Sequence, residues 1–249
     1  MMRWICRCGG AGRVIGFFLL IVLPFSAQAG DFAISPVHVH LSQHHPIAAL
    51  VLTNLQDTSL TVQATAQAWS QAHGKNMTTD THSLIISPPL FAVPPHGKQI
   101  IRVGLRTPIP LRQEKDYRLI LHEVPPPPNP KVTGVQIVLR MILPVFVAPL
   151  EKAAPLQLQV SAHVTKNGFS LQMVNDGNRH VEISGVRISE NDHEIFRKDL
   201  LMYVLPASRQ EIDIPVAQSL SYVGKTLSVQ IMTRQKEQPI DASVVVVAS

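Results

Sequence analysis

Apolar and polar residues alternate with a period of two along much of this chain, and this pattern constrains its fold more than any other feature. Over residues 60–68, apolar side chains at the even positions alternate with Thr and Gln at the odd positions. Successive side chains of a β-strand point to opposite faces of a sheet, so the pattern predicts a strand with one buried face. Similar runs occupy residues 47–54, 84–87, 99–105, 117–124 and 135–147. No stretch of ten or more residues has convincing helical periodicity, so the chain is predicted to be all-β.

The second half of the chain repeats the alternation with different residues. Strands are expected over residues 156–164, 181–189, 211–214, 227–233 and 243–248, and hairpin turns at residues 166–168 (KNG) and 175–177 (NDG). Seven or so short strands in the first half is the spacing of an immunoglobulin-like sandwich. We therefore predict two tandem immunoglobulin-like β-sandwich domains with a cleft between them, over residues 30–149 and 150–249.

The N-terminus has the layout of a secretory signal peptide. Residues 3–13 hold three arginines and no acidic residue, an apolar run follows over residues 14–25, and Ala27 and Ala29 complete an A-x-A motif. A retained membrane helix would need about 20 apolar residues, more than this run provides. We expect cleavage after Ala29, a periplasmic location and no membrane insertion after cleavage.

Removal of the signal peptide changes the composition of the remaining protein. Both cysteines, Cys6 and Cys8, lie in the signal, so the exported chain has no disulfide and must be stabilised by its cores alone. Three of the 22 basic residues also leave, so 19 remain against 17 acidic residues. This near balance of charge implies neither a nucleic-acid partner nor a membrane-surface partner.

The sequence contains no constellation typical of an enzyme. It has no nucleophile elbow, phosphate-binding loop or zinc-protease motif, and no thiol remains after processing. We therefore expect no catalytic activity and no cofactor. One alternative is a periplasmic metal-binding β-sandwich protein, because imidazole is a common copper or zinc ligand and four histidines lie close together in the sequence. They are His38, His40, His44 and His45.

The most informative region is the pair of strands over residues 117–124 and 135–147. A segment rich in proline, residues 125–134, separates them and should project from one end of the domain. In the second strand, one row of side chains is apolar throughout and the opposite row is only half apolar. The apolar row consists of Val135, Ile137, Leu139 and Met141. Periodicity alone leaves open whether this row lines the domain's own core or faces a partner.

Six segments of the first domain resemble, in the right order, those of the periplasmic pilus-assembly chaperones of the chaperone–usher pathway, the PapD-like chaperones. The segments are 35–37 (SPV), 52–54 (LTN), 87–91 (SPPLF), 99–103 (QIIRV), 117–119 (YRL) and 143–147 (LPVFV). The last of these most resembles the archaic branch, which is associated with spore-coat-U-like subunits. The second domain agrees with the family in size and class.

The resemblance implies a mechanism of capping. Pilus subunits of this pathway are immunoglobulin-like folds without their last strand, and the chaperone lends them a strand by β-strand addition. The implied partners are pilus subunits and an outer-membrane usher. The implied donated side chains are Val135, Ile137, Leu139 and Met141. The opposite row, with Arg140, is then expected to face the domain's own core. A rival reading makes the chain itself a pilus subunit, but such subunits are usually single incomplete sandwiches.

The chain departs from the family at the positions that normally bind the subunit's terminal carboxylate. An Arg on the first strand and a Lys on the donor strand are replaced by His38 and Pro144. The usual anchor pair is therefore missing, and we expect His38 to be only a flanking contact.

Arg118 is the predicted substitute for this anchor. If the proline-rich segment closes a hairpin with Val124 opposite Val135, Arg118 lies opposite Met141 and flanks the apolar row. An arginine there is suited to bind a carboxylate with two hydrogen bonds, and the alternative is an ion pair within the chain. His122 is expected to face the same way.

Overall fold

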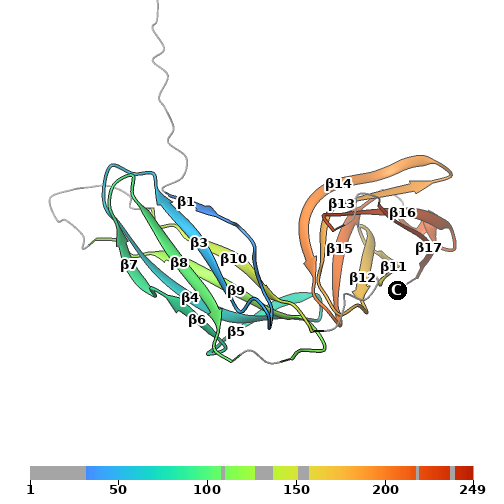
Figure 1. Ribbon diagram of the computed structural model, residues 1–249. Coiled ribbons are helices and arrows are strands. Elements are labelled where there is room, and N and C mark those ends of the chain that lie inside the picture. Colours follow the sequence, from blue (N-terminus) through green and yellow to red (C-terminus); the bar gives the residue numbers. More distant parts are fainter. Residues whose placement is uncertain are drawn as a thin grey trace, which may run out of the picture.

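The computed structural model describes residues 32–107, 110–126, 137–150, 157–216, 219–235 and 239–248. These residues form two β-sandwiches in succession (Figure 1). The only helix within them is a short 3-10 turn, η1 (Ser219–Tyr222). In the described part of the chain, no helix is long and apolar enough to cross a membrane. The prediction of an all-β chain of two sandwich domains is confirmed, whereas the expected signal peptide lies outside the described residues.

Ten strands form the two sheets of the first domain. They are β1 (Phe32–Ser35), β2 (Val39–Leu41), β3 (Ile47–Asn54), β4 (Leu60–Ala72), β5 (Lys75–Asp80), β6 (Leu84–Ser87), β7 (Leu90–Val93), β8 (Lys98–Leu105), β9 (Lys115–Glu123) and β10 (Arg140–Val147). One sheet has the order β1-β3-β8-β6, and the other has the order β2-β10-β9-β4-β5, with β7 also paired to β4. The chain therefore crosses from one sheet to the other between β1 and β2.

The core of the first domain is filled by alternate residues of both sheets. On one sheet, Leu50 and Leu52 of β3 lie beside Ile101 of β8, all fully buried. On the other, Val62 of β4 and Leu119 of β9 are also fully buried in the same cluster. The period-two pattern of the sequence thus produces one buried face on each sheet, as expected for a sandwich.

Seven strands form the second domain. They are β11 (Leu158–Thr165), β12 (Gly168–Asn175), β13 (Val181–Glu190), β14 (His193–Val204), β15 (Ser208–Pro215), β16 (Thr226–Thr233) and β17 (Ile240–Val247). Their order is β14-β13-β16-β17-β11-β12-β15. The two layers are linked through β17, which pairs with β16 along most of its length and with β11 at its end.

One of the two hairpins expected in the second domain is present. Residues 166 and 167 join β11 to β12, and Gly168 has a φ of +154°. A Cβ atom at this position would overlap the carbonyl oxygen of Ile214, so only glycine fits. The expectation for residues 175–177 was wrong, because β12 and β13 belong to different layers and do not pair. Asn175 is buried there and organises a crossover instead.

A buried asparagine closes the same kind of loop in each domain. The side-chain nitrogen of Asn54 donates to the carbonyl oxygens of Thr58, Val93 and Pro94 at 2.8–3.1 Å, and its oxygen accepts from the backbone N–H of Gln56. In the second domain, Asn175 donates to the carbonyl oxygens of Arg179 and Val204 and accepts from the N–H of Gly177. Each asparagine satisfies backbone groups that would otherwise be buried without a partner.

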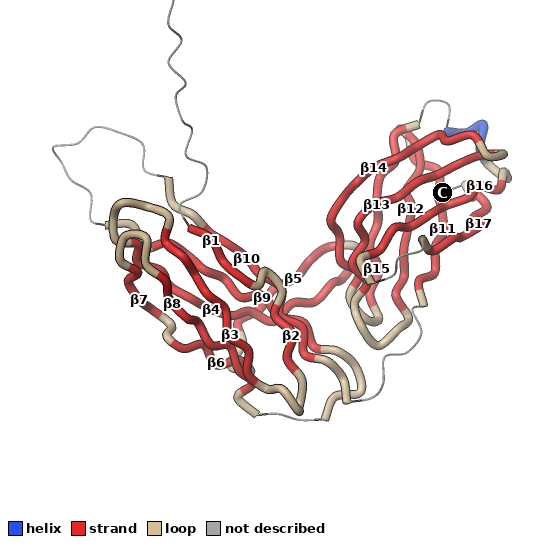
Figure 2. The backbone as a smooth tube through the Cα atoms, turned by 45° about the horizontal axis from the view of Figure 1, so that its top comes forward, coloured by secondary structure: helices blue, strands red, loops and turns tan. Residues whose placement is uncertain are grey.

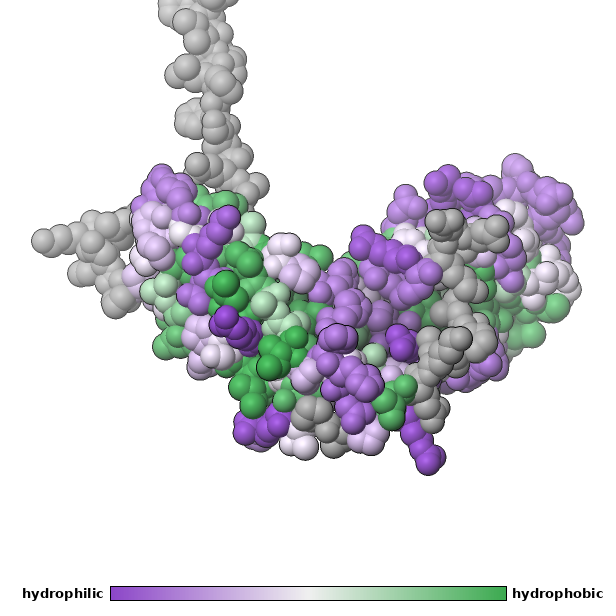
Figure 3. All heavy atoms as spheres, in the orientation of Figure 1, coloured by the Kyte–Doolittle hydropathy of each residue, from purple (hydrophilic) through white to green (hydrophobic). Residues whose placement is uncertain are grey.

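The two sandwiches meet at their adjoining ends and diverge from there (Figure 2). The space-filling view shows a hollow between their upper parts (Figure 3). This hollow agrees with the predicted cleft between the domains, and the β10–β9–β4 sheet of the first domain reaches the junction at its base.

Candidate functional site

Strand β10 has an open edge. On one side it is antiparallel to β9 along its whole length, but on the other side β2 pairs with only its last three residues. The carbonyl oxygen of Leu139 accepts a hydrogen bond from the N–H of Glu123, so backbone groups at Leu139 and at alternate residues beyond it point toward β9. The backbone groups of Arg140 and Ile142 therefore point to the open side. Among the described residues, no strand pairs with β10 there between Arg140 and Pro144.

The apolar row of this strand runs out of the domain's own core. Farther along the strand, Leu143, Val145 and Val147 are fully buried in the core. Leu139 and Met141 lie partly buried against the same core, whereas Ile137 is 76% exposed. Val135 lies outside the described residues. The row thus lines the core at one end and reaches solvent at the other.

The opposite row of β10 faces outward. Val138 and Ile142 are 37% and 46% exposed, and Arg140 is exposed between them. The expectation that Arg140 faces the core was wrong, because it assumed that the core row and the apolar row are different rows. The expected strand over residues 135–147 also begins later, at Arg140, because the N–H of Leu139 bonds to the carboxylate of Glu123.

The pairing of β9 with β10 differs by three residues from the predicted register. Arg118 lies opposite Pro144, and Met141 lies opposite Leu121. A shift by an odd number of residues moves a side chain to the other face of the sheet. Arg118 is therefore on the outward face, beside Pro144, and does not flank the apolar row.

Arg118 has no acidic partner among the described residues. Its guanidinium lies 4.5 Å from the centre of the Trp69 ring, a cation–π arrangement. Burial lowers the pKa of Arg118, but an arginine in a protein stays protonated. The cation is thus half-buried, positioned by an aromatic ring and, within the described residues, without a carboxylate partner.

The four clustered histidines do not converge. The Nε2 atom of His38 lies 2.8 Å from the hydroxyl of Tyr203 in the second domain, and His40 stacks on Phe146 at a centroid distance of 5.7 Å. Burial raises the pKa of Tyr203 to about 12, so its hydroxyl keeps its proton. His44 and His45 are exposed in the turn after β2. Within the described residues, none of the four belongs to a group of three metal-ligating side chains.

His122 lies on the outward face of the sheet, nearer the C-terminal end of β9 than Arg118. It is opposite Arg140 on β10 and opposite Gln63 on β4, and it is exposed. The structure therefore brings His122 and Arg118 to the same face as predicted, with Ile120 between them.

A small aromatic cluster joins the domains. Trp69 and Phe146 of the first domain pack with Leu205 of the second, all nearly fully buried, and Tyr203 packs against them. The ring of His180 stacks on Phe146 at a centroid distance of 3.6 Å. Sequence analysis missed this junction. A signal was available, because residues 143–147 are apolar on both rows, which is unusual for a strand with a wet outer face.

Two acidic residues complete the junction. Glu114 is 5% exposed, and its Oε1 atom accepts a 2.8 Å hydrogen bond from the backbone N–H of His180 and lies 2.7 Å from His180 Nδ1. Burial, together with the charge of Glu114, raises the pKa of Asp116 to about 8. These three residues come from both domains and were not predicted as a site.

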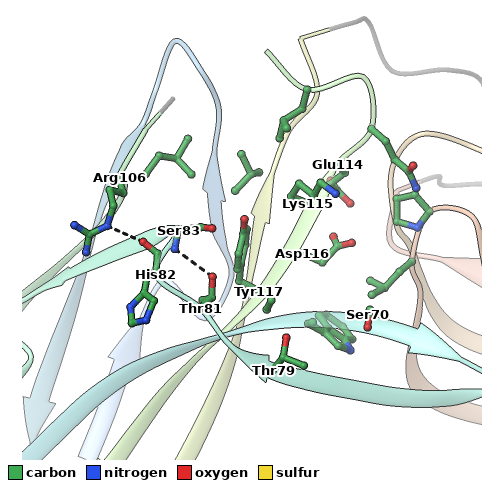
Figure 4. Close-up of a pocket in the computed structure, with 18 of the residues that line it drawn as sticks. Ser70, Thr79, Thr81, His82, Ser83, Arg106, Glu114, Lys115, Asp116 and Tyr117 are labelled. Carbon is green, nitrogen blue, oxygen red and sulfur yellow. Dashed lines mark hydrogen bonds between the residues drawn. The ribbon is translucent and has the colours of Figure 1, made fainter. Parts of the chain in front are cut away.

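A cavity of about 840 Å³ opens beside these residues (Figure 4). Glu114 and Asp116 form part of its wall, and Arg106 and His82 lie at the opposite side. Pro206 of the second domain also lines it. The cavity therefore gives solvent a path to the carboxylates at the junction.

The comparisons with known proteins match these observations. Residues 31–152 match the family model described as pili and flagellar-assembly chaperone, PapD N-terminal domain. No curated protein sequence matches the chain. Several solved structures are similar over most of it, and at these identities the likeness establishes the fold.

Three of these structures illustrate the likeness. A chain of the CsuC–CsuE chaperone–tip adhesion subunit pre-assembly complex, from archaic chaperone-usher Csu pili of Acinetobacter baumannii, is 20% identical with a TM-score of 0.65, covering 87% of this chain and 99% of that chain. A chain of the Salmonella enterica SafA pilin–SafB chaperone complex is 16% identical with a TM-score of 0.59, covering 88% and 98%. The E. coli chaperone DraB is 17% identical with a TM-score of 0.58, covering 86% and 96%.

Proposed function

Because this chain belongs to the PapD-like family of pilus-assembly chaperones, we propose that it caps pilus subunits in the periplasm by donor-strand complementation and delivers them to an outer-membrane usher. The observation that carries the proposal is the open edge of β10 together with an apolar row that leaves the core and ends in solvent at Ile137. The family is a class of non-enzymatic chaperones, and capping by strand addition requires no catalytic group.

The arrangement of the row supports strand addition. Leu139 and Met141 continue the core row of the domain. If a subunit bound at the open edge, the hydrophobic core of the chaperone would therefore be continuous with the hydrophobic core of the subunit. Full burial of an exposed aliphatic side chain contributes about 1.5–3 kcal/mol, which applies to Ile137. Leu139 and Met141 are already partly buried, so each contributes less. Backbone pairing along Arg140–Pro144 would add hydrogen bonds and cover the edge.

Arg118 is the proposed site for the subunit's terminal carboxylate. It is a half-buried cation without an acidic partner in the described chain, and it lies at the base of the open edge opposite Pro144. A guanidinium binds a carboxylate through two hydrogen bonds. Such a contact would fix the register of the donated strand, because a slip by one residue would turn the apolar row away from the subunit. His38 and His122 flank this position on the same side.

Co-expression with a candidate subunit in a bacterial periplasm tests the capping mechanism. We expect wild type to co-purify with the subunit as a soluble one-to-one complex. Ile137→Asp should abolish that complex while the chaperone itself stays folded, because Ile137 is exposed in the free protein. Leu139 is less suitable for this test, because a charge there would also disturb the domain's own core.

Val138→Asp is the matched control. Val138 is the neighbouring apolar residue on the opposite row, so it receives the same charge without entering the subunit's groove. The Val138→Asp variant should keep the complex. If Ile137→Asp retained the subunit, or if both variants lost it equally, the apolar row would not be the donated surface and the mechanism would be wrong.

A further inference from the structure

Three metal-ligating side chains from the two domains converge at the junction. The ligand atoms of Glu114, Asp116 and His180 all lie within 4.8 Å of one another. In the described chain this is the only group of three or more such residues. The first two residues precede or begin β9, and His180 precedes β13, so the group exists only when the domains are assembled.

One oxygen in this group is left without a partner. Asp116 Oδ1 is buried and makes no hydrogen bond, whereas Glu114 Oε1 is held by two groups of His180. A buried oxygen without a hydrogen bond is unfavourable. A cation bound between the carboxylates and the imidazole would give this oxygen a partner.

We propose that Glu114, Asp116 and His180 bind a divalent first-row transition-metal ion, with Zn²⁺ as the best fit, and that this ion links the two domains. Imidazole nitrogen and carboxylate oxygen atoms are both zinc ligands in proteins. Zinc accepts ligands at roughly 2.0–2.2 Å, so the donor atoms need to move to separations of about 3.4 Å. The close pair of Glu114 and His180 must open slightly, and Asp116 must approach.

The surroundings provide what such a site needs. The backbone N–H of His180 holds the Glu114 carboxylate, and the Phe146 ring holds the imidazole plane. Contacts of this kind orient the ligands of metal sites. The neighbouring cavity, which Glu114 and Asp116 line, supplies an entry path and space for a water molecule in the fourth position. This site is separate from the histidines around β2 and from the open edge of β10.

Zinc titration of the chelator-treated protein, residues 30–249, tests the proposal. We expect wild type to bind one Zn²⁺ per chain in isothermal titration calorimetry and equilibrium dialysis. Asp116→Asn and His180→Gln preserve size and polarity but each removes a ligand, so each should weaken binding at least tenfold. Saturating zinc should raise the thermal unfolding midpoint of wild type but not of these variants.

Two control variants distinguish the sites. His40→Gln removes an imidazole beside Phe146, and the double variant His44→Gln/His45→Gln removes the exposed pair, so both should bind zinc like wild type. The proposal is overturned if wild type binds no zinc saturably, if Asp116→Asn binds like wild type, or if binding is lost only in the control variants. Asp116→Asn keeps the test valid if His180→Gln fails to fold. Capping of subunits can be measured separately, so failure here leaves the proposed function untouched.

Discussion

Arg118 and Pro144 are directly opposite each other on β9 and β10, on the face that looks away from the domain core. Pro144 occupies the position at which the chain's resemblance to the family places a lysine. Directly opposed residues of an antiparallel pair have Cα atoms about 4.5–5.5 Å apart. Arg118 thus places a cation on the neighbouring strand, at the level of the ladder where the family's lysine is missing.

Replacing Arg118 should weaken subunit capture. Hydrogen bonds to charged groups contribute about 1.5–3 kcal/mol, so Arg118→Gln should weaken the complex by roughly tenfold to a hundredfold. Affinity measurement by surface-attached subunit peptide or by competition would show this change. Arg140→Gln is the matched control, since Arg140 is exposed on the same face but lies opposite His122. Equal affinity of the two variants would argue against Arg118 as the anchor.

Truncating Phe146 should loosen the domain junction. Replacement of a buried phenylalanine by alanine usually costs about 3–5 kcal/mol, and Phe146 is 1% exposed. Without residues 1–29, Trp69 is the only tryptophan of the chain, and its ring lies 6.3 Å from that of Phe146. Phe146→Ala should therefore lower stability and shift Trp69 fluorescence. Phe169→Ala, in the core of the second domain, should lower stability without changing the fluorescence of the folded protein.

Removing the buried asparagines should destabilise each domain separately. Asn54→Ala leaves backbone groups of the β7 region without a donor, and each unsatisfied buried group costs about 1–3 kcal/mol. Asn175→Ala should do the same in the second domain. Denaturant unfolding, followed by probes in each domain, would measure both losses. Asn167→Ala, at an exposed hairpin turn, serves as the control, and a loss of stability there equal to that of Asn54→Ala would contradict the account.

Acidification should weaken the protein through His40. Partial burial lowers the pKa of His40, and nearby His180 and His38 lower it further. A histidine whose pKa is lower in the folded state binds a proton more readily when the protein is unfolded, so protonation favours unfolding. Its contribution to stability is therefore present above the unfolded pKa of about 6.5 and is lost as the pH falls below it. The raised pKa of Asp116 has the opposite effect on stability over this range, and it acts in wild type and in the variants alike. The test is therefore a difference: between pH 7.5 and 5.5 the thermal midpoint of wild type should fall relative to that of His40→Gln. His44→Gln, in the exposed turn, should follow wild type.

The strands predicted from the sequence bury one face, but β7 and β12, which also bury one face, were not among them, and strands with mostly exposed residues were missed. The alternation in residues 60–68 correctly indicated β4. By contrast, all six residues of β5 are exposed, and this strand forms only because it pairs with the extended end of β4. β14 was missed for a related reason, since its middle is mostly exposed. Strands that are stabilised by backbone pairing alone leave no apolar pattern in the sequence.

The candidate site was predicted in composition more successfully than in geometry. The apolar row and Arg118 were both proposed from the sequence, and their roles stay predictions. The register between them was inferred from an assumed hairpin and was wrong by three residues. The length of the proline-rich segment that connects the two strands did not predict which of their residues pair. The contacts of Glu114 with His180 join residues 66 positions apart, and no local pattern indicates such a pair.

Pro144 also limits how long a strand can be added to the chaperone. It has no N–H to offer a ladder, and immediately beyond it β2 already pairs with β10. A partner strand growing along the open edge must therefore stop at the level of Arg118. If subunits are captured at this edge as proposed, this fixed stop would align every one of them from the same end of the edge, whatever its sequence farther along.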